Sequence, residues 1–305
     1  MHTEFKSLFD LLRVIPDEQA AIDHFTSIRW RNGKFCPLCG STKIYHFSDN
    51  RTHKCGDCKR RFSIKVGTIF QDTKIPLQKW LMAVWLLTSH KKGIASTTLA
   101  RDIDVTQKTA WYMLHRLRHA ATTETFNAPL DGTVEADETF IGGKERNKHR
   151  SKRTGGTQGG KGKAVVFGML DRDGDLRTTH TPNLRAQTVQ DIIIENVMPG
   201  STMMTDEHPS FAGLSRSYYH HTVNHSAGEY VRHYTIHTNG IESVWALFKR
   251  QIIGIHHVIS PKHLSRYLSE MTWRFNRREQ GEGSRVNSLL TYADRNPITY
   301  RELIA

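Results

Sequence analysis

Three acidic residues have the type and placement for metal-dependent chemistry on a phosphodiester: Asp137, Asp206 and Glu242. Apolar and polar residues alternate through 133–141, so this stretch is predicted to be a half-buried strand that turns Asp137 to its wet face. Asp206 ends a short apolar stretch, and Glu242 stands in the first turn of a predicted helix. Three converging carboxylates can hold two divalent cations about 4 Å apart, which is an arrangement that cleaves phosphodiesters.

Neighbouring residues offer alternatives for these roles. Glu135 shares the predicted face of Asp137 and is a competing ligand. Asn239 precedes Glu242 by three residues, so the two form either a capping box or two candidates for the third ligand; we favour Glu242 for its charge. His237 either orients a substrate or has a structural role.

Four cysteines form two pairs with metal-ligand spacing: Cys36, Cys39, Cys55 and Cys58. Two CxxC pairs fifteen residues apart supply four thiolates to one tetrahedral Zn²⁺, and the short β-like segments 43–47 and 61–65 suit a zinc ribbon. A disulfide pair or free thiols are the alternatives. We favour zinc, because a domain this small lacks the hydrophobic core to fold without a stabilising cross-link such as a bound metal ion.

Apolar stripes between 77 and 119 predict three helices. The last begins after Thr106 and follows a short turn, as in a helix-turn-helix unit. Gln107 and Lys108 lie at its start, where base contacts are expected, and Arg116 lies farther along the same helix. A helical spacer without DNA contacts is the alternative.

The region after Pro129 changes character. It is predicted to contain three strands, a helix over 186–197, two more strands and a helix that begins at Asn239. A basic, glycine-rich loop, 142–162, interrupts the first strands and includes Lys148 and Arg150. This loop either clamps a DNA backbone or is simply solvated, and we favour the clamp because like charges repel without a polyanion.

The overall charge favours a polyanionic partner. The chain of 305 residues has 43 Lys and Arg against 30 Asp and Glu, a net charge of +13. This balance is typical of nucleic-acid binding. The longest apolar run, 80–87, is too short for a membrane span, and the first residues do not form a signal peptide. We therefore expect a cytoplasmic protein.

Several motifs together resemble one family, the DDE transposases of bacterial insertion sequences, specifically the ISXO type with an N-terminal zinc ribbon. The motifs are CPLCG, CGDC, VEADETFIGG, TDEHPSF, HTNGIESVWALFKR and HHVISPKHLSRYL followed by FNRR. The resemblance implies that Asp137, Asp206 and Glu242 bind two Mg²⁺ or Mn²⁺ ions. It also implies that Lys249, seven residues beyond Glu242, holds a DNA phosphate.

The fold class implied is an α+β multidomain protein with a zinc ribbon, a helix-turn-helix domain and an RNase H-like α/β catalytic domain. We expect an N-terminal packing region at 1–34, the ribbon at 35–70, the helix-turn-helix domain at 71–127, the catalytic domain at 128–280 and a C-terminal tail at 281–305.

The function implied is DNA transposition. The protein is expected to bind double-stranded DNA at terminal inverted repeats, to cut it and to join it to target DNA, as a homodimer or higher oligomer associated with the bacterial nucleoid. Two other functions stay open: a DNA-binding regulator that no longer cuts, and a structure-directed nuclease without strand transfer.

Overall fold

The computed structural model describes residues 5–49, 51–123, 128–143, 149–152, 160, 162–295 and 297–305. Contacts divide the chain into two compact units. One comprises Met1–Thr123 and Arg277–Ala305, and the other comprises Glu124–Asn276. Among the described residues, no helix is long and apolar enough to cross a bilayer.

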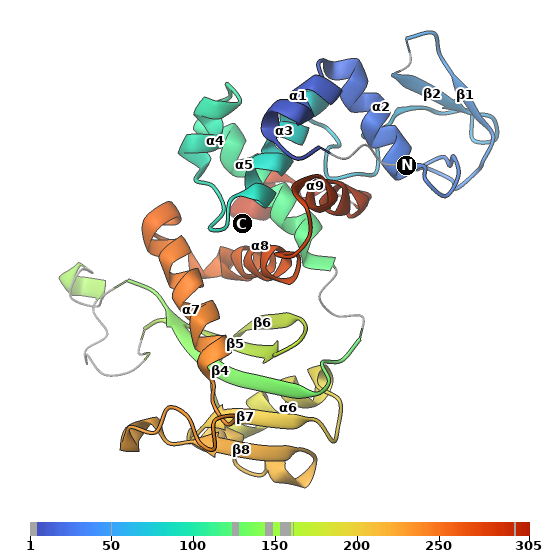
Figure 1. Ribbon diagram of the computed structural model, residues 1–305. Coiled ribbons are helices and arrows are strands. Elements are labelled where there is room, and N and C mark those ends of the chain that lie inside the picture. Colours follow the sequence, from blue (N-terminus) through green and yellow to red (C-terminus); the bar gives the residue numbers. More distant parts are fainter. Residues whose placement is uncertain are drawn as a thin grey trace. The chain divides into compact units, whose positions relative to one another are not determined.

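The first unit begins with two helices and a small antiparallel sheet (Figure 1). The helices are α1 (Leu8–Val14) and α2 (Glu18–Arg29), and the strands are β1 (Ile44–His46), β2 (Thr52–Cys55) and β3 (Arg61–Ser63). Asp17 caps α2, since its side chain accepts a hydrogen bond from the N–H of Ala20. The central strand β2 ends at Cys55, so the sheet positions one member of the second cysteine pair.

Three further helices follow the ribbon: α3 (Leu77–Ser89), α4 (Ser96–Asp102) and α5 (Gln107–Ala120). Helix α3 is apolar on nearly all sides, and its residues Trp80, Leu81 and Val84 are buried in the core of this unit. The α5 helix begins at the predicted cap Thr106, whose hydroxyl accepts from the N–H of Thr109. The prediction of three helices is therefore confirmed.

The C-terminal segment is not a tail, contrary to our prediction. It forms α9 (Glu282–Thr291) and α10 (Tyr300–Ile304), and α9 packs against α2 and α3. Val286, Leu289 and Leu290 lie at helical spacing and are buried, which gives α9 an apolar face that the core must cover. The second unit accordingly ends at Asn276 rather than at 280.

The second unit is built on a five-stranded sheet with the order β6-β5-β4-β7-β8. Its strands are β4 (Thr133–Ile141), β5 (Ala164–Asp171), β6 (Leu176–Thr181), β7 (Thr202–Asp206) and β8 (Tyr219–Val223). β5 is antiparallel to both of its neighbours, whereas β4, β7 and β8 run parallel. Parallel neighbours require crossover connections, and these bring helices onto the sheet.

Helices cover both faces of this sheet. These helices are α6 (Ala186–Asn196), α7 (Asn239–Gln251) and α8 (Leu264–Asn276). The unit also contains short helical segments, which are η3 (Arg150–Lys152), η4 (Pro209–Phe211), η5 (Leu214–Arg216), η6 (His225–Ala227), η7 (Ile252–His256) and η8 (Pro261–His263). One apolar core lies between the sheet and α6, and a second lies between the sheet and α7 with α8. Figure 1 shows α7 crossing the sheet. The predicted order of strands and helices is confirmed.

The burial of β4 differs from the predicted half-buried strand. Val134 and Ala136 belong to the core beneath α6, while Glu135 and Thr139 on the other face are buried beside α7. Both faces are covered because α6 packs on one side of the sheet and α7 on the other, and only Asp137 and a few neighbours keep partial exposure.

A close approach at Gly168 sets the position of α7. Gly168 pairs with Asp137 across β4 and β5. A Cβ atom at Gly168 would lie 2.5 Å from the indole of Trp245, so only glycine lets α7 pack this closely beside Asp137.

Candidate active site

Asp137 and Asp206 lie on neighbouring parallel strands. The last paired residues of β4 and β7 are Glu135 and Met204, and the two aspartates stand two residues farther along each strand. Alternate residues of a strand point to the same face, so both carboxylates belong to the face covered by α7. The two acids, separated by 69 positions in the sequence, are therefore brought side by side, with Asp137 in the middle of β4 and Asp206 at the carboxyl end of β7.

Glu242 approaches from the first turn of α7. Its carboxylate Oε1 accepts a hydrogen bond from Thr238 Oγ1 at 2.9 Å and lies 3.2 Å from His225 Nε2. His225 belongs to the short turn η6, and Glu207 pins that turn by accepting from the N–H of His225 and of Ser226. Glu242 is thus oriented by Thr238, which directly precedes α7, and by His225, which lies just after β8.

The carboxylates influence one another. Burial, followed by the negative charges of Glu138, Asp206 and Glu242, raises the pKa of Asp137 to about 7. A carboxyl group that is costly to ionise beside other acids is a typical place for a cation to bind, because the cation restores the balance of charge.

Glu138 was not among the predicted site residues. Burial and the charge of Asp206 raise its pKa to about 7, and its Oε2 is buried without a hydrogen-bond partner. Its position directly after Asp137 was visible in the sequence, but the alternating pattern assigned it to the opposite face. Its closeness to Asp206 follows from the pairing of β4 with β7.

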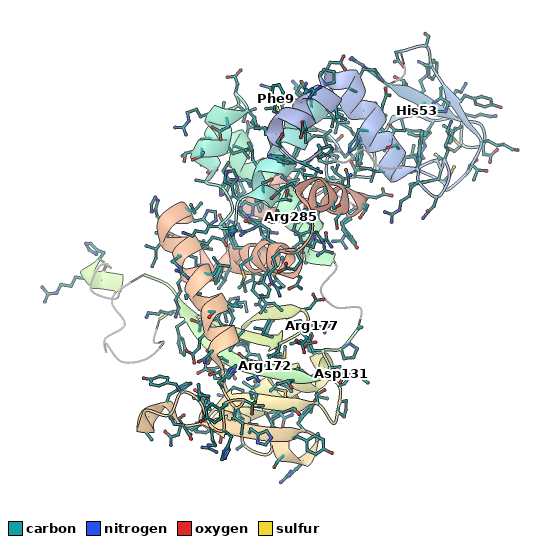
Figure 2. All side chains as sticks on the ribbon, in the orientation of Figure 1. Phe9, His53, Asp131, Arg172, Arg177 and Arg285 are labelled. Atoms are coloured by element: carbon teal, nitrogen blue, oxygen red, sulfur yellow. The ribbon has the colours of Figure 1, made fainter. Side chains whose placement is uncertain are left out.

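Glu135 has a structural role instead of competing as a ligand. It is 1% exposed and accepts hydrogen bonds from Arg172 Nε at 2.8 Å and from the N–H of Ile241 at 2.9 Å. His237 Nδ1 lies 3.2 Å from the same carboxylate. Arg172 also donates to the carbonyl of His237, and Figure 2 shows Arg172 beside the end of α7 that meets the sheet. These contacts fix the start of α7 over β4.

Two other predicted residues lie on the exposed side of α7. Asn239 is exposed at the first position of the helix, and Lys249 is exposed near its end. Seven residues separate Glu242 from Lys249, which places them on one face about 10 Å apart along the axis.

The four cysteine sulfurs form a compact set. They lie within 4.8 Å of one another, with 3.8 Å between Cys36 Sγ and Cys58 Sγ and 3.6 Å between Cys39 Sγ and Cys55 Sγ. A tetrahedral Zn²⁺ with bonds of about 2.3 Å holds its sulfurs about 3.8 Å apart, so the donor set fits this ion. All four are free thiols, which rules out the disulfide alternative in this structure.

The environment of Cys55 favours a thiolate. Burial opposes its ionisation, but the N–H groups of Cys58 and Asp57 point at its sulfur at 3.4 Å, and its pKa is lowered to about 6. Within the described part of the chain, these cysteines are the set of side chains gathered tightly enough to bind a single ion. The carboxylates beside Asp137 are spaced more widely.

The residues predicted to touch DNA have different surroundings. Gln107 and Lys108 are exposed at the start of α5, where Gln107 donates to Ser96 and Lys108 lies 4.7 Å above the ring of Tyr300. Arg150 is exposed in η3, and Lys148 lies outside the described residues.

Arg116 requires a correction. It is 3% exposed, and its guanidinium donates to the carbonyls of Ile69, Gln71 and Ile298. These hydrogen bonds hold α5, the end of the ribbon and the C-terminal segment together. Because its donors are already bonded to main-chain carbonyls, the guanidinium is not available to bind a phosphate.

Comparisons with known sequences cover both units. Residues 129–276 match the ISXO2-like transposase domain, and residues 16–61 match the transposase zinc-ribbon domain. The chain is 28% identical over 276 residues to an uncharacterized protein in transposable element ISH50 of Halobacterium salinarum, covering 84% of this chain and 90% of that protein. It is 36% identical over 103 residues to an uncharacterized transposase-like protein of Haemophilus influenzae, covering 33% of this chain and 81% of that protein.

Two solved structures align more weakly. A simian T-cell lymphotropic virus intasome, in complex with PP2A regulatory subunit B56 gamma, aligns with a TM-score of 0.27 and 13% identity over 57% of this chain and 63% of that chain. A pre-cleavage Mos1 transpososome aligns with a TM-score of 0.24 and 11% identity over 72% of this chain and 80% of that chain. At these TM-scores neither alignment carries an argument.

Proposed function

Because the chain belongs to the ISXO2-like transposase family, we propose that it is an insertion-sequence transposase that cleaves DNA at terminal inverted repeats and joins the ends to target DNA. The observation that best supports this function is the meeting of Asp137, Asp206 and Glu242, whose charges act on one another between the middle of β4, the carboxyl end of β7 and the start of α7.

We assign the second unit to the RNase H-like class. Support comes from the mixed five-stranded sheet, with one acid on the first strand, one at the end of the fourth and one on a helix that packs across the sheet. The three acids would hold two Mg²⁺ or Mn²⁺ ions, which supply an activated water and neutralise charge at the scissile phosphate when bound.

The chain's own residues position the reacting strand. At an element end, the oxygen of a water molecule attacks phosphorus and the 3′-oxygen leaves as a hydroxyl. That 3′-hydroxyl then attacks a phosphodiester of target DNA, and a target 3′-oxygen leaves, so no bond between protein and DNA forms. Lys249, on the exposed side of α7, would hold a phosphate of the bound strand, with Lys148 and Arg150 contributing from the basic loop.

The first unit would recognise the element ends. Helices α4 and α5 follow each other with the short turn of a helix-turn-helix, and Gln107 and Lys108 are exposed at the start of α5, where such units contact bases. Two ends must be held together for joining, so the working form would be at least a homodimer.

The test is cleavage and joining of labelled DNA from the flanks of the gene, with Mg²⁺ or Mn²⁺. Wild type should nick at the repeat ends and join them to target, whereas Asp206→Ala and the closer mimic Asp206→Asn should do neither. Asp191→Asn, an exposed acid on α6, is the matched control and should retain activity.

The outcomes separate the candidate functions. Specific binding without cutting by any variant would refute catalysis and leave a DNA-binding regulator. Metal-dependent cutting of branched DNA without joining would indicate a nuclease instead of a transposase.

A further inference from the structure

The segment between β8 and α7 carries large side chains that are mostly exposed. We call residues Glu229–Ile236 the aromatic hairpin; Figure 1 shows this region as the orange loop that leads from the sheet edge into α7. Within it Tyr234 is 97% exposed, Tyr230 is 60% exposed and Val231 is 45% exposed. A tyrosine with both ring faces in water contributes almost nothing to the packing of the chain.

The aromatic hairpin is nevertheless a defined structure. Arg232 and Ile236 exchange two main-chain hydrogen bonds of 2.9 Å, and the Arg232 guanidinium donates to both oxygens of Glu229 at 2.8 and 2.7 Å. Arg172 donates to the carbonyl of Thr235 at 2.8 Å. The residue directly after the tip is therefore held by the same arginine that fixes the start of α7.

The tip is held in an unfavourable backbone conformation. His233 has a φ of 49° and Tyr234 a φ of 65°, in the left-handed region that disfavours residues with a Cβ. Glycine or asparagine would relieve this strain at either position. A strained tip that carries a fully exposed aromatic ring indicates a role in binding.

The hairpin adjoins the candidate active site. The ring of Tyr230 packs on the ring of His225, with 5.5 Å between the centroids, and His225 Nε2 lies 3.2 Å from Glu242 Oε1. The hairpin is thus joined to Glu242 through one intervening side chain. DNA bound across the three acids would pass this hairpin.

We propose that Tyr234 stacks on a nucleobase of the DNA strand next to the scissile phosphate. This role rests on the proposed function. A phenol ring stacks on any base through its π face, and such stacks contribute about 1–3 kcal/mol, or roughly 5- to 150-fold in affinity. Stacking beside Glu242 would fix the position of the phosphate that is attacked.

The chemistry of the hairpin favours a base over a second protein surface. The hairpin has three large exposed apolar or aromatic side chains, Tyr230, Val231 and Tyr234, and the polar Arg232 and His233 separate Tyr234 from the other two along the chain. A stable protein interface needs about 800 Å² on each partner around a buried anchor, whereas stacking on a base needs only the two faces of one ring.

The experiment uses the full-length, zinc-loaded protein and the DNA end that wild type nicks, with 2-aminopurine placed in turn at each position flanking the nick. Wild type and Tyr234→Phe should quench the probe at one position. Tyr234→Ala should lose this quench and cleave about 5- to 150-fold more slowly. Tyr234→Gly should behave like Tyr234→Ala in both assays while melting no earlier than wild type, because glycine relieves the strain at the tip.

Tyr219→Ala is the matched control. Tyr219 is 70% exposed on the same unit, but it starts β8 at the end of the sheet opposite to Asp206, so its removal should leave quench and cleavage unchanged.

Each remaining outcome overturns a specific statement. If wild type cleaves and Tyr234→Ala matches it in quench and rate, the stacking role is wrong and the proposed function stands. If Tyr234→Ala retains the quench but lowers the oligomeric state in light scattering, the hairpin is a contact between copies of the chain. If wild type does not cleave, the proposed function fails and the stacking role fails with it.

Discussion

Replacing Asp137 by Asn should stabilise the protein at neutral and alkaline pH when no divalent ion other than zinc is present. Burial and three neighbouring acids raise the pKa of Asp137 from 3.8 to about 7. At a pH between these two pKa values, Asp137 holds a proton in the folded protein but has released it in the unfolded chain. The free energy of unfolding therefore falls as the pH rises from about 4 to about 7, and it stays low above that.

The size of the effect follows from the shift in pKa. A rise of about three units corresponds to on the order of 4 kcal/mol at 1.36 kcal/mol per unit. Asparagine keeps the shape of the side chain and has no charge to bury. At pH 8 the variant should therefore regain much of this lost free energy of unfolding. Glu138 remains in the variant, and burial and the charge of Asp206 raise its pKa to about 7, so part of the pH dependence should remain.

Hydrogen exchange of peptides from β4 and α7, corrected for intrinsic rates, measures the local free energy at pH 5 and pH 8. Wild type should lose protection between these values, and Asp137→Asn should lose at most half as much. Added Mg²⁺ should restore protection of wild type at pH 8 more than at pH 5, because the ion replaces the proton, and should have no effect on the variant.

Asp191→Asn, on the exposed side of α6, controls for loss of a surface charge and should follow wild type. The reasoning is refuted if Asp137→Asn is less protected than wild type at pH 8, or if both proteins lose protection equally between pH 5 and pH 8.

Three other substitutions test the fold around the site. Cys39→Ser should lower the zinc content below one ion per chain and unfold the ribbon, and metal analysis with circular dichroism checks this; a fully loaded variant would contradict the four-cysteine site. Arg116→Met should cost about 1–3 kcal/mol in urea unfolding, since buried carbonyls lose their donor. The folded Arg116→Met variant should bind DNA with the affinity of wild type. A large loss of affinity would show that Arg116 contacts DNA. Gly168→Ala should lower the melting temperature and the cleavage rate together, because the new methyl group meets Trp245; unchanged values would show that α7 can shift freely.

Local patterns in the sequence predicted most elements of the fold. Ile241, Val244, Trp245 and Phe248 recur at helical spacing, and they form the buried face of α7. Periodicity reports on such faces directly, because the neighbours within an element are set by the geometry of the backbone. The cysteine spacing likewise predicted four sulfurs that converge.

Roles that depend on distant partners were not visible. Arg116 has the type and position of a DNA-binding residue, but carbonyls 47 and 182 positions away in the chain accept its hydrogen bonds. Glu135 shares a face with Asp137, yet Arg172 and the start of α7 engage it. The segment after 280 looks like a tail until α2 and α3 supply the surface that α9 covers.

The sequence by itself therefore determined the kinds of elements, the acids and cysteines proposed to carry chemistry, and their order along the chain. Only the tertiary structure decided which acids share one electrostatic environment, which charged groups are structural, and that Glu138 and the aromatic hairpin border the same site. The physical reason is that burial and charge act through space, so the partners of a side chain are set by strand pairing and helix packing between segments far apart in the chain.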